Sequence, residues 1–529
     1  MVGFSWFFGG MMVLLTITGL AMMETGCARS KNAGSTMMEA IIAVTIAIPC
    51  FMLIGGIISG LEESNAMMLE AMLAALACCI LVGGVIGRMK VIGFMAVCAV
   101  TALFSYPLSV RTCRILSDFG AYQDFGGFGT VFLSGAAAAY FASRVLGTRT
   151  GKSTKGAAAN VVPGHNIPFA LAGMLILCVG LIGMAGANGL LTEISESVLS
   201  KAAENIMIGG SISGLAGLLF TYIRYRKPDI TMTASAAAAG FVAAVPGCDS
   251  VAFGCMCLIG ALTGLCTIVG IESMERGGKV DDPAGVAVIF GIGGSFGLLG
   301  TGIFNTQTGL KAFPGNLAAV LLIFVIHGVM TGVTEIILNR FHLLRISSEQ
   351  EMEGVDLCEY GLMSSYNDFQ MNLDTTDWTD LYVQAKSGEE NRETSFKEPY
   401  VYEAAKKQEI PLTKIEIICR KEKLEALKMA LNDIGIMGMT VSSVTGCGVQ
   451  KGYNEYYRGV PISVQLRAKV RIEVVVAKVP VEEVVNTARR VLFTGHVGDG
   501  KIFIYSLNDV VRVRTGENGY AAMQGALSE

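Results

Sequence analysis

Histidine is scarce in this chain and tryptophan almost absent: the 529 residues contain four His and two Trp. Only 16% of the residues are charged and 52% are hydrophobic, a balance too apolar for an ordinary soluble enzyme. The 14 Cys are scattered, mostly inside apolar runs, without the paired spacing of a metal site or a disulfide framework. We therefore expect small buried cysteines, no enzyme activity, no redox cofactor and no nucleic-acid partner.

Long hydrophobic runs dominate the first two thirds of the chain, and eleven of them are long enough to cross a lipid bilayer. They fall near 4–26, 38–60, 66–87, 91–110, 129–146, 167–187, 205–224, 231–245, 251–272, 284–304 and 317–339. Lys and Arg concentrate in the loops after odd-numbered runs, and the positive-inside rule makes those loops cytoplasmic. The sequence predicts a polytopic α-helical protein of the cell membrane (plasma or inner), with its N-terminus outside and its C-terminal part in the cytoplasm.

The stretch 124–136 places an acid and several glycines at the start of a hydrophobic helix. An aspartate there accepts hydrogen bonds from free amides and suits the positive end of the helix dipole. Glycine lets neighbouring helices approach closely in lipid. The stretch resembles the start of the fifth membrane helix in the ammonium transporter family (Amt/Mep/Rh), in which the position of Phe132 is normally a pore histidine.

Other segments resemble the same family in the same order and at the same spacing. They are 6–32, 164–168, 281–304 and 354–361, the last of which resembles the family's regulatory C-terminal segment. The resemblance covers residues 1 to about 366. It implies the ammonium transporter fold, assembly as a homotrimer in the bilayer, and ammonium as the ligand.

The resemblance also implies a pore, and the residues at its key positions have changed. The family's two pore histidines fall on Phe132 and Phe290, its two gate phenylalanines on Leu73 and Met184, and its mouth serine on Asn188. The tryptophan of the outer site has no counterpart. Phenylalanine offers an ion neither donor nor acceptor, so we expect the twin-histidine route to be absent and conduction to be negligible.

Three polar residues within or beside the spans have roles that the sequence leaves open. Glu70 lies in the third span, where a carboxylate is by default a functional hypothesis. It could pair with NH4+ at the outer mouth, with Asn188 supplying an oxygen, or it could be solvated or neutral against a neighbouring helix. We expect Asp124 to cap its helix and shape the vestibule rather than bind substrate. His327, the one histidine within a span, is expected to be packed or helix-bonded rather than a proton relay.

A polar segment separates the hydrophobic part of the chain from a small soluble part. We predict three regions: a transmembrane domain at 1–345, a tail segment and linker at 346–410, and a soluble domain at 411–529. Alternating and amphipathic patterns in the last region predict strands and helices in the order βαββαβ. They lie at 412–419, 421–434, 438–444, 469–476, 481–492 and 501–506. This order predicts an α+β ferredoxin-like fold.

Two motifs in the soluble domain suit phosphate. A glycine-rich turn with a lysine precedes the last strand, at 494–503, and backbone amides with a cation at such a turn bind phosphate. Arg512 and Arg514 are two residues apart and are predicted to share one strand face. Together with 446–452 and 455–459, these motifs resemble the nitrogen-regulatory P-II proteins (GlnB/GlnK-like) over residues 412–523.

The P-II resemblance implies specific ligands. Carried over by position, ATP or ADP is bound by Thr440, Gly448, Val449, Val475, Gly498, Asp499, Gly500, Lys501, Arg512 and Arg514. Gln450, Gly452 and Lys469 bind 2-oxoglutarate, and Gln450 also completes a Mg2+ site with ATP. The T-loop spans about 450–468. The tyrosine that is uridylylated in the enteric proteins falls on Ile462, so control is expected to come from ligands.

Two main hypotheses and one weaker alternative follow for the whole chain. In the first, an ammonium sensor with negligible conduction transmits its state to a P-II domain that reads nitrogen and energy status through ATP, ADP and 2-oxoglutarate. In the alternative, a self-regulated NH4+/NH3 transporter is gated by its own T-loop. A purely structural membrane anchor for P-II is the weakest reading. A downstream protein that reads the P-II domain is a possible further partner.

Overall fold

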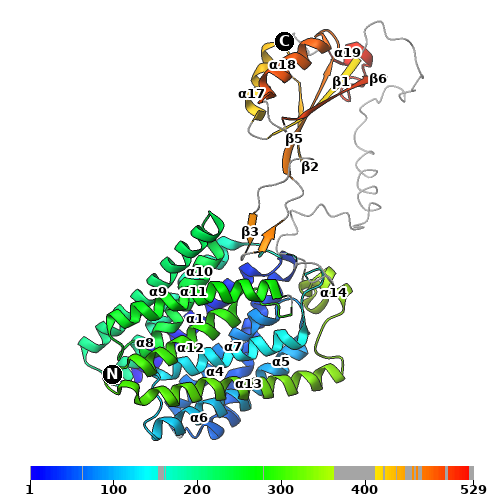
Figure 1. Ribbon diagram of the computed structural model, residues 1–529. Coiled ribbons are helices and arrows are strands. Elements are labelled where there is room, and N and C mark those ends of the chain that lie inside the picture. The colour runs from blue at the N-terminus through cyan, green and yellow to red at the C-terminus, as the bar shows by residue number, and fades with distance from the viewer. Residues whose placement is uncertain are drawn as a thin grey trace. The chain divides into compact units, whose positions relative to one another are not determined.

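A computed structural model gives the structure of this chain (Figure 1). It describes residues 2–61, 63–152, 160, 162–277, 279–362, 412–420, 423–436, 438–446, 455–457, 460–462, 467–494 and 499–523. The chain divides into two compact units. The first consists of Met1–Met371 with Tyr456–Ile462, and the second of Asn372–Glu455 with Ser463–Glu529.

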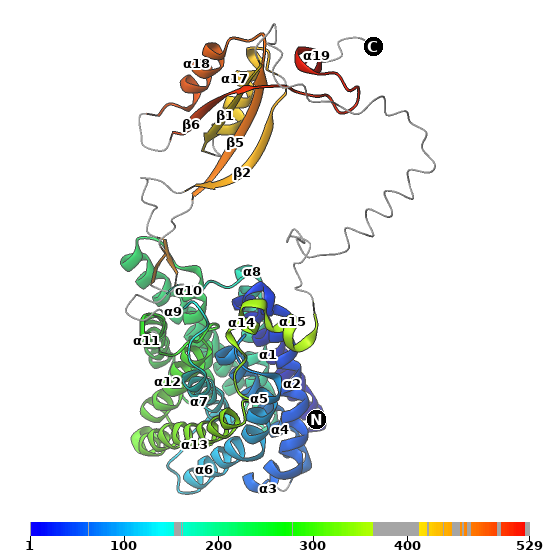
Figure 2. The ribbon, with the colours of Figure 1, turned by 90° about the vertical axis from the view of Figure 1, so that its right-hand side faces the viewer.

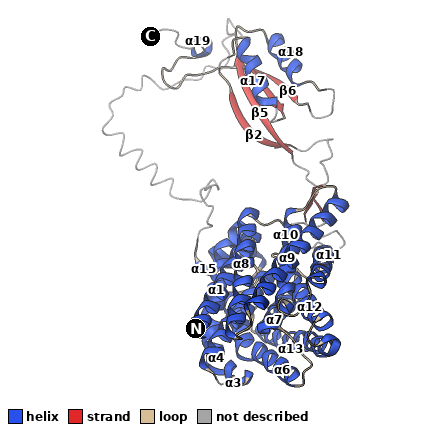
Figure 3. Ribbon diagram, turned by 90° about the vertical axis from the view of Figure 1, so that its left-hand side faces the viewer, coloured by secondary structure: helices blue, strands red, loops and turns tan. Residues whose placement is uncertain are grey.

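The first unit contains eleven apolar helical segments long enough to cross a membrane, which confirms the predicted number in the part of the chain that the structure describes. Figure 3 shows that these segments are all helical. The helices are α1 (Val2–Cys27), α2 (Ala33–Cys50), α3 (Gly56–Ser59), α4 (Ser64–Val85), α5 (Val91–Val100), α6 (Tyr106–Asp118), α7 (Phe128–Leu146), α8 (Ile167–Leu191), α9 (Glu196–Tyr225), α10 (Ile230–Ala244), α11 (Phe253–Gly277), α12 (Val286–Phe304) and α13 (Phe313–Arg340).

Two of the spans are interrupted by a turn of π-helix. The turn η2 (Phe51–Gly55) joins α2 to α3, and η3 (Thr101–Ser105) joins α5 to α6. A proline lies beside each turn, Pro49 in the first case and Pro107 in the second. Proline donates no backbone hydrogen bond and disturbs the regular helical ladder, and π-turns of this kind are frequent at functional sites. The second interruption positions Tyr106, the residue that directly follows η3.

Small residues allow the helices of this unit to pack closely. The α1–α8 pair is the clearest case, because a Cβ atom on Gly19 would lie 2.6 Å from the carbonyl oxygen of Gly173. Close backbone approach of this kind supplies packing energy where lipid provides no hydrophobic drive between helices. Figure 2 shows α4, α7 and α12 among the helices of the bundle. The apolar core formed by these and neighbouring helices contains Phe132 and Phe290.

The last span is followed by a short helical tail. It consists of α14 (Ser348–Glu353), which begins with a capping box between Ser347 and Gln350, and α15 (Val355–Tyr360). Gly354 separates the two helices with φ +120, and a Cβ at this position would lie 2.7 Å from the carbonyl oxygen of Lys31. The turn therefore requires glycine.

The second unit is an antiparallel sheet with two helices, in the predicted order. Its main elements are β1 (Leu412–Cys419), α17 (Leu424–Asp433), β2 (Thr440–Gly446), β5 (Arg467–Val476), α18 (Val481–Leu492), β6 (Lys501–Leu507) and the short α19 (Gly519–Met523). The strand order of this sheet is β2-β5-β1-β6. Between β2 and β5 in the sequence, β3 (Glu455–Tyr457) and β4 (Val460–Ile462) form a separate two-stranded sheet, most of which belongs to the first unit. The ferredoxin-like prediction is confirmed.

The core of the second unit lies on one face of the sheet. Alternate residues of β1 and β5, such as Ile415 and Ile472, are buried together with Leu427 of α17 and Val484 of α18. Alternation places these strand residues on the same face, so both helices cover that face (Figure 2).

Candidate functional site

A cavity of about 320 Å³ opens near the start of α7. Its lining brings together Glu70 of α4, Tyr106 and Arg114 of α6, and Asp124 of the segment before α7. The two carboxylates singled out from the sequence therefore share one cavity, although they are far apart in the chain. The two carboxylates in the lining make the cavity suitable for a cation.

Glu70 is held by a side chain from another span. The Tyr106 hydroxyl donates a hydrogen bond to Glu70 Oε2 at 2.6 Å. The guanidinium of Arg114, which lines the same cavity, donates to the carbonyl oxygens of Ser59 and Gly60 at 3.3 and 3.0 Å. Glu70 is half-buried rather than exposed. It therefore lies in a polar pocket between spans.

Asp124 caps α7. Its carboxylate accepts hydrogen bonds from the amides of Gly129 and Thr130, both at 3.0 Å, and from the Tyr122 hydroxyl at 2.7 Å. The turn that allows this contains Gly126 and Gly127, with φ +67 and +70, a conformation that favours glycine. These bonds leave Asp124 fixed in place at the cavity wall.

Asn188 of α8 lies beside this turn. A Cβ atom on Gly126 would lie 3.0 Å from Asn188 Cγ, and Gly126 itself lines the cavity. The structure thus brings Asn188 close to the cavity that contains Glu70 and Asp124.

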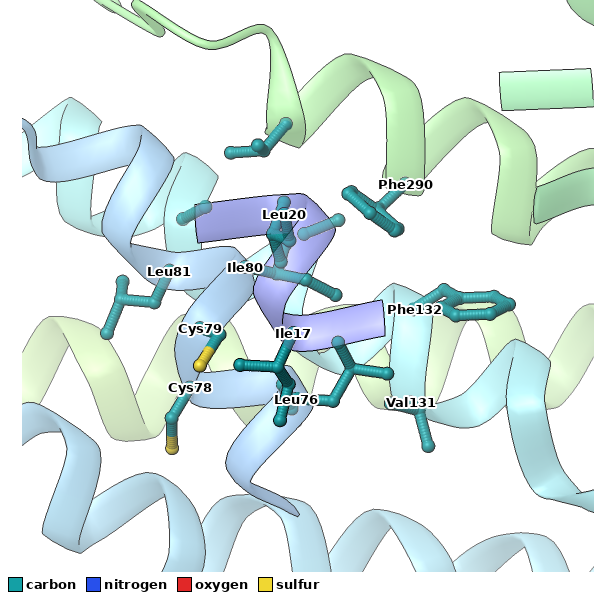
Figure 4. Packing of buried hydrophobic residues seen from close by; sticks show 14 of the residues in the cluster. Ile17, Leu20, Leu76, Cys78, Cys79, Ile80, Leu81, Val131, Phe132 and Phe290 are labelled. Atoms are coloured by element: carbon teal, nitrogen blue, oxygen red, sulfur yellow. The ribbon is translucent and has the colours of Figure 1, made fainter. Parts of the chain in front are cut away.

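One turn into α7, the interior becomes apolar. The rings of Phe132 and Phe290 have centroids 5.8 Å apart with planes tilted by 43°, and both side chains are fully buried. Figure 4 shows the two rings next to each other, with Leu20 and Ile80 nearby. Leu73 and Met184 are also buried, and the Thr16 hydroxyl approaches Met184 Sδ at 3.1 Å. Phenylalanines thus fill the two positions where the family resemblance implies pore histidines, and Leu73 and Met184 fill the two where it implies gate phenylalanines.

At the opposite end of α7, a buried ionic cluster closes the helix bundle. The carboxylate of Asp281 forms ion pairs with Arg149 Nε at 2.8 Å, with Lys152 Nζ at 2.7 Å and with Arg88 Nη1 at 3.7 Å. Burial by itself would raise the pKa of Asp281, but the charges of Arg149, Arg88 and Lys152 hold it well below its usual range. The carboxylate therefore stays ionised and holds the loops after α4 and α7 together.

The tail is bound to the same end of the bundle. Asp356 accepts hydrogen bonds from the amides of Gly34 and Ser35, which begin α2. Glu351 accepts from the amide and hydroxyl of Thr150 at 2.6 and 2.9 Å, and it pairs with Arg345 at 3.0 Å. The tail thus contacts loops that follow two different spans and connects the helix bundle to the chain that leads to the second unit.

In the second unit, some of the proposed nucleotide residues are described. Gly500 has φ +136, and a Cβ there would lie 2.3 Å from the Ile418 carbonyl oxygen, so this turn requires glycine. Asp499 accepts from the Thr494 amide at 2.7 Å and pairs with Arg420 at 3.5 Å, which fixes the turn before β6. Gly448, Val449, Gln450, Gly452 and Gly498 lie outside the described residues.

The prediction that Arg512 and Arg514 share a strand face is wrong. Val511 makes only an isolated bridge to Asn518, and the backbone turns after Arg512. Arg512 pairs with Glu517 at 2.8 Å, whereas Arg514 is exposed within the turn. The two-residue repeat of side-chain direction holds only in extended strands, and this segment is not one.

The described nucleotide and 2-oxoglutarate residues are not gathered at one place in a single chain. Thr440 begins the edge strand β2, and Lys501 begins the opposite edge strand β6. Three strand spacings separate these edges, about 14 Å. Along β5, Lys469 pairs with β2 at Val444, whereas Val475 lies near the other end of the strand and pairs with β1 at Lys414. Within one copy of the domain, these described residues therefore lie in two separate groups.

Several residues of the cavity were not identified from the sequence. Tyr106 and Tyr122 hold the two carboxylates, and Arg114 adds a cation to the lining. The available signals were Pro107, which marks a break in the fourth span next to Tyr106, and the position of Tyr122 two residues before Asp124.

These features define a class before any relative is considered: in the described part of the chain, a bundle of eleven apolar helical segments with an acidic cavity at one end, joined to a ferredoxin-like unit. The chain belongs to the Ammonium Transporter Family, which its residues 59–365 match, and residues 412–517 match the family Nitrogen regulatory protein P-II. It is a membrane protein in which an ammonium transporter domain is fused to a P-II regulatory domain. Both families consist of transporters or regulators rather than enzymes.

Known relatives cover the two parts separately. Ammonium transporter Amt2 of Archaeoglobus fulgidus is 27% identical over an alignment of 410 residues, which covers 68% of this chain and 86% of the relative. The nitrogen regulatory PII-like protein of Bacillus subtilis is 48% identical over 110 residues, 21% of this chain and 95% of the relative. GlnK of Escherichia coli is 44% identical over 109 residues, 21% of this chain and 97% of the relative.

Solved structures agree with the fold of the first unit. A structure titled Sensor Amt Protein matches with TM-score 0.63 and 22% identity over 68% of this chain and 98% of its own. Mep2 of Candida albicans matches with TM-score 0.57 and 20% identity over 65% of this chain and 87% of its own. At these identities the likeness shows the fold alone.

Proposed function

We propose that this protein is an ammonium sensor: its membrane domain binds ammonium in the Glu70–Asp124 cavity with negligible conduction, and its P-II domain couples that state to ATP, ADP and 2-oxoglutarate. The observation that carries the proposal is the packed pair Phe132–Phe290, whose rings lie 5.8 Å apart in a fully buried position.

An ion that leaves the cavity toward these rings loses its hydration shell. Phe132, Phe290 and the neighbouring Leu73 supply no oxygen or nitrogen to replace it. Moving a charge into such surroundings without a partner is strongly unfavourable, and a hydrophobic constriction of this kind closes a pore. The cavity is thus a binding site at the end of a blocked path.

The cavity has the charge that a monovalent cation needs. Glu70 and Asp124 contribute two carboxylates and Arg114 one guanidinium. Asn188 lies beside Gly126 of the cavity lining, and we propose its amide oxygen as a further acceptor. Ammonium donates hydrogen bonds in four directions, so it can satisfy carboxylate and amide oxygens together.

The tail provides a physical connection from the membrane domain to the regulator. We infer that the N-terminus lies outside the cell membrane (plasma or inner) and that the P-II domain is cytoplasmic, because basic residues concentrate at the Asp281 end of the spans, where the tail is bound. A structure titled Sensor Amt Protein has the same fold, so the fold is compatible with the proposed signalling role.

The P-II domain is proposed to bind ATP or ADP, with Mg2+ and 2-oxoglutarate bound through Gln450. Since Thr440 and Lys501 lie on opposite edges of one sheet, a complete nucleotide site needs residues from two copies. This supports a homotrimer, the assembly that both family resemblances imply. In such a trimer, the fusion keeps three P-II domains at high local concentration beside three membrane domains. A downstream protein would then bind the P-II domains according to their ligand state.

The alternative is a self-regulated ammonium transporter gated by its own T-loop. Membership of the Ammonium Transporter Family favours it. In that case the ion passes the Phe132–Phe290 pair by a route without histidine.

Electrophysiology of the purified full-length protein on a solid-supported bilayer separates the two. We expect no ammonium current above that of empty liposomes, with or without ATP, ADP and 2-oxoglutarate, while a family member that retains both pore histidines gives a current in parallel. A saturable current that ADP or 2-oxoglutarate changes would overturn the sensor in favour of the transporter. In the sensor, ammonium must also change the affinity of the P-II domain for nucleotide, because coupling between two sites is reciprocal. If ammonium leaves that affinity unchanged, the membrane domain only anchors the P-II domain to the membrane.

A further inference from the structure

The last span contains a buried polar stripe that plays no part in the cavity or the plug. His327, Thr331 and Glu335 are spaced four residues apart on α13, so they lie on one face of the helix. Their side chains are 0%, 1% and 0% exposed. The opposite face of α13 is apolar and exposed, with Val325, Val329 and others, as expected of a helix that contacts lipid.

None of the polar atoms of this stripe has a hydrogen-bond partner among the described residues. This is true of both ring nitrogens of His327, the hydroxyl of Thr331 and both carboxylate oxygens of Glu335. Nε of Arg88, a buried guanidinium whose charge acts on Glu335, is likewise without a partner in the described chain. Buried polar groups in proteins are nearly always satisfied, by protein or by ordered water. A stripe of such atoms over three helical turns therefore requires an explanation.

The spacing fits water. Residues four apart on a helix are separated by about 6 Å along the axis. A single water molecule with two hydrogen bonds bridges a gap of about that length. Each bridging water between His327 and Thr331, or between Thr331 and Glu335, would find two or more polar partners, which is what a buried water needs.

The surroundings leave the stripe closed at one end. One turn before His327, Ile323 packs with Ala319, Leu133 and Leu298 in an apolar cluster that blocks the way toward the cavity. At the other end, Glu335 lies within reach of the charge of Arg88, which hydrogen-bonds the carbonyl oxygen of Asp281 at the basic end of the bundle. The elements that pack against α13 supply no competing carboxylate. The helices α12 and η3 contain no titratable side chain, and the titratable side chains of α5 and α7 are Cys98, Tyr140 and Arg144. The helix α6 contains one acid, Asp118, which lies at the opposite end of its span.

We propose that this stripe holds a chain of buried water molecules that runs from His327 to Glu335 and ends beside the buried Arg88. The membrane domain thus contains a hydrated blind branch, separate from the Phe132–Phe290 plug, in which water connects an imidazole to a carboxyl. The inference does not depend on ammonium binding.

X-ray hydroxyl-radical footprinting of the full-length protein in lipid nanodiscs tests this, because radicals formed from internal water label the side chains next to that water. We expect His327 to be oxidised several-fold faster than Phe132 and Phe290, which are equally buried but lie in the apolar plug. Labelling of His327 no faster than that of the two phenylalanines would show a dry stripe and overturn the proposal.

Substitution of Thr331 gives an independent test, because a water chain and a dry stripe predict opposite changes in the stability of the variant. Thr331→Val keeps the shape of the side chain and removes its hydroxyl. With a water chain, this variant should unfold at a lower temperature and lose His327 labelling. In a dry stripe it should unfold at the same or a higher temperature, because an unsatisfied group has been removed. Thr263→Val is the matched control, since Thr263 is equally buried but its hydroxyl bonds the Ile259 carbonyl oxygen at 2.7 Å. If Thr331→Val fails to assemble, the labelling of the wild type decides.

Discussion

The carboxylate of Asp356 accepts a hydrogen bond from the backbone amide of Ser35 at 2.6 Å, across 321 residues of chain. A second bond from Gly34 at 2.9 Å completes the cap of α2. An acid at a helix start satisfies free amides and interacts favourably with the dipole. The cap of a membrane helix therefore comes from the tail, and release of the tail uncaps that helix.

Asp356→Ala should loosen the tail. Loss of an N-cap acid costs about 0.5–2 kcal/mol, so the tail should detach more often and the first amides of α2 should lose protection. Hydrogen–deuterium exchange of residues 33–38 and 347–360 measures both effects. Glu349→Ala changes an exposed acid of the same tail and should leave exchange as in the wild type. Equal exchange in the two variants would mean that Asp356 does not hold the tail.

Much of this architecture follows from the sequence because physical constraints act locally. The thickness of a bilayer fixes the length of an apolar span, so the eleven spans were predictable from run length alone. The alternation in 412–419 and 469–476 likewise predicted β1 and β5 because one face of the sheet is buried. The π-turns at Phe51–Gly55 and Thr101–Ser105 were not predicted, since they have no distinct hydrophobic period.

The sites were predictable only in part. Glu70 stands out as a carboxylate in a span, but its partner Tyr106 is 36 residues away and no local pattern connects them. The Arg512–Arg514 interpretation failed because it assumed an extended strand, whereas residues 513–515 form a turn that Gly516 follows with φ +70. Contacts between distant segments, and the local exceptions to a regular strand, are decided by tertiary packing rather than by sequence spacing.

The ionic cluster around Asp281 predicts a large loss of stability on neutralisation. Asp281→Asn removes the buried counter-charge that Arg149, Lys152 and Arg88 share and leaves Lys152 paired with Glu275 at 2.7 Å. Breaking a buried ion pair from one side costs about 3–5 kcal/mol. The variant should therefore unfold at a clearly lower denaturant concentration or temperature. Glu204→Gln, which neutralises an exposed acid of α9, should change the midpoint little, and equal midpoints for the two variants would contradict the assignment.

The same carboxylate gives a pH dependence with a definite sign. The pKa of Asp281 in the folded protein lies well below its usual value. A carboxyl with a lowered folded pKa stabilises the fold above its unfolded pKa of about 3.9, and this stability is lost as the pH falls through the folded pKa. Asp281 should thus contribute a constant stability between roughly pH 5 and 8 and a falling one below about pH 4. The stabilities of the wild type and of Asp281→Asn, measured from unfolding curves, should become equal only at acidic pH. Equal stabilities near neutral pH would contradict a lowered pKa of Asp281.

Nucleotide binding tests the P-II assignment. Arg514 is exposed in its turn and free to reach a phosphate. Arg514→Ala should weaken ATP binding by about 1.5–3 kcal/mol, the range of a charge-assisted hydrogen bond. Calorimetry on the full-length protein measures this, with Arg490→Ala, an exposed arginine of α18, as the control that should bind normally. Equal affinities in both variants would remove Arg514 from the site.

The second ligand should depend on the first. If Gln450 joins Mg2+, ATP and 2-oxoglutarate, then 2-oxoglutarate should bind only when Mg-ATP is present. Calorimetric titration with ATP alone, with Mg-ATP and with neither separates the cases. An affinity for 2-oxoglutarate that is the same in all three conditions would disprove the shared site.

Glu70 decides whether the cavity senses ammonium. Its carboxylate and that of Asp124 line the same space, and Asp124 is already committed to the amides of α7. Glu70 is therefore the group whose charge is most available to a bound cation. Glu70→Gln keeps the size and a carbonyl oxygen that Tyr106 can still donate to, but it removes the charge. We expect the ammonium-dependent change in nucleotide affinity to disappear in this variant while the trimer remains intact.

Two further variants separate charge from structure. Tyr106→Phe removes the hydroxyl that donates to Glu70 at 2.6 Å, which leaves the carboxylate with more capacity to accept from a cation, so the response should persist. Glu63→Gln neutralises an exposed acid just before α4 and reports any general effect of charge at this end of the bundle. Two quantities are measured as ammonium is added: hydrogen–deuterium exchange of the tail, and the affinity of the protein for ADP. Methylammonium and K+ are titrated for comparison. A full ammonium response in Glu70→Gln would mean that Glu70 only packs α4 against Tyr106 and that ammonium binds elsewhere. Loss of the response in Glu63→Gln as well would point to the electrostatic field of the whole surface rather than to a bound ion.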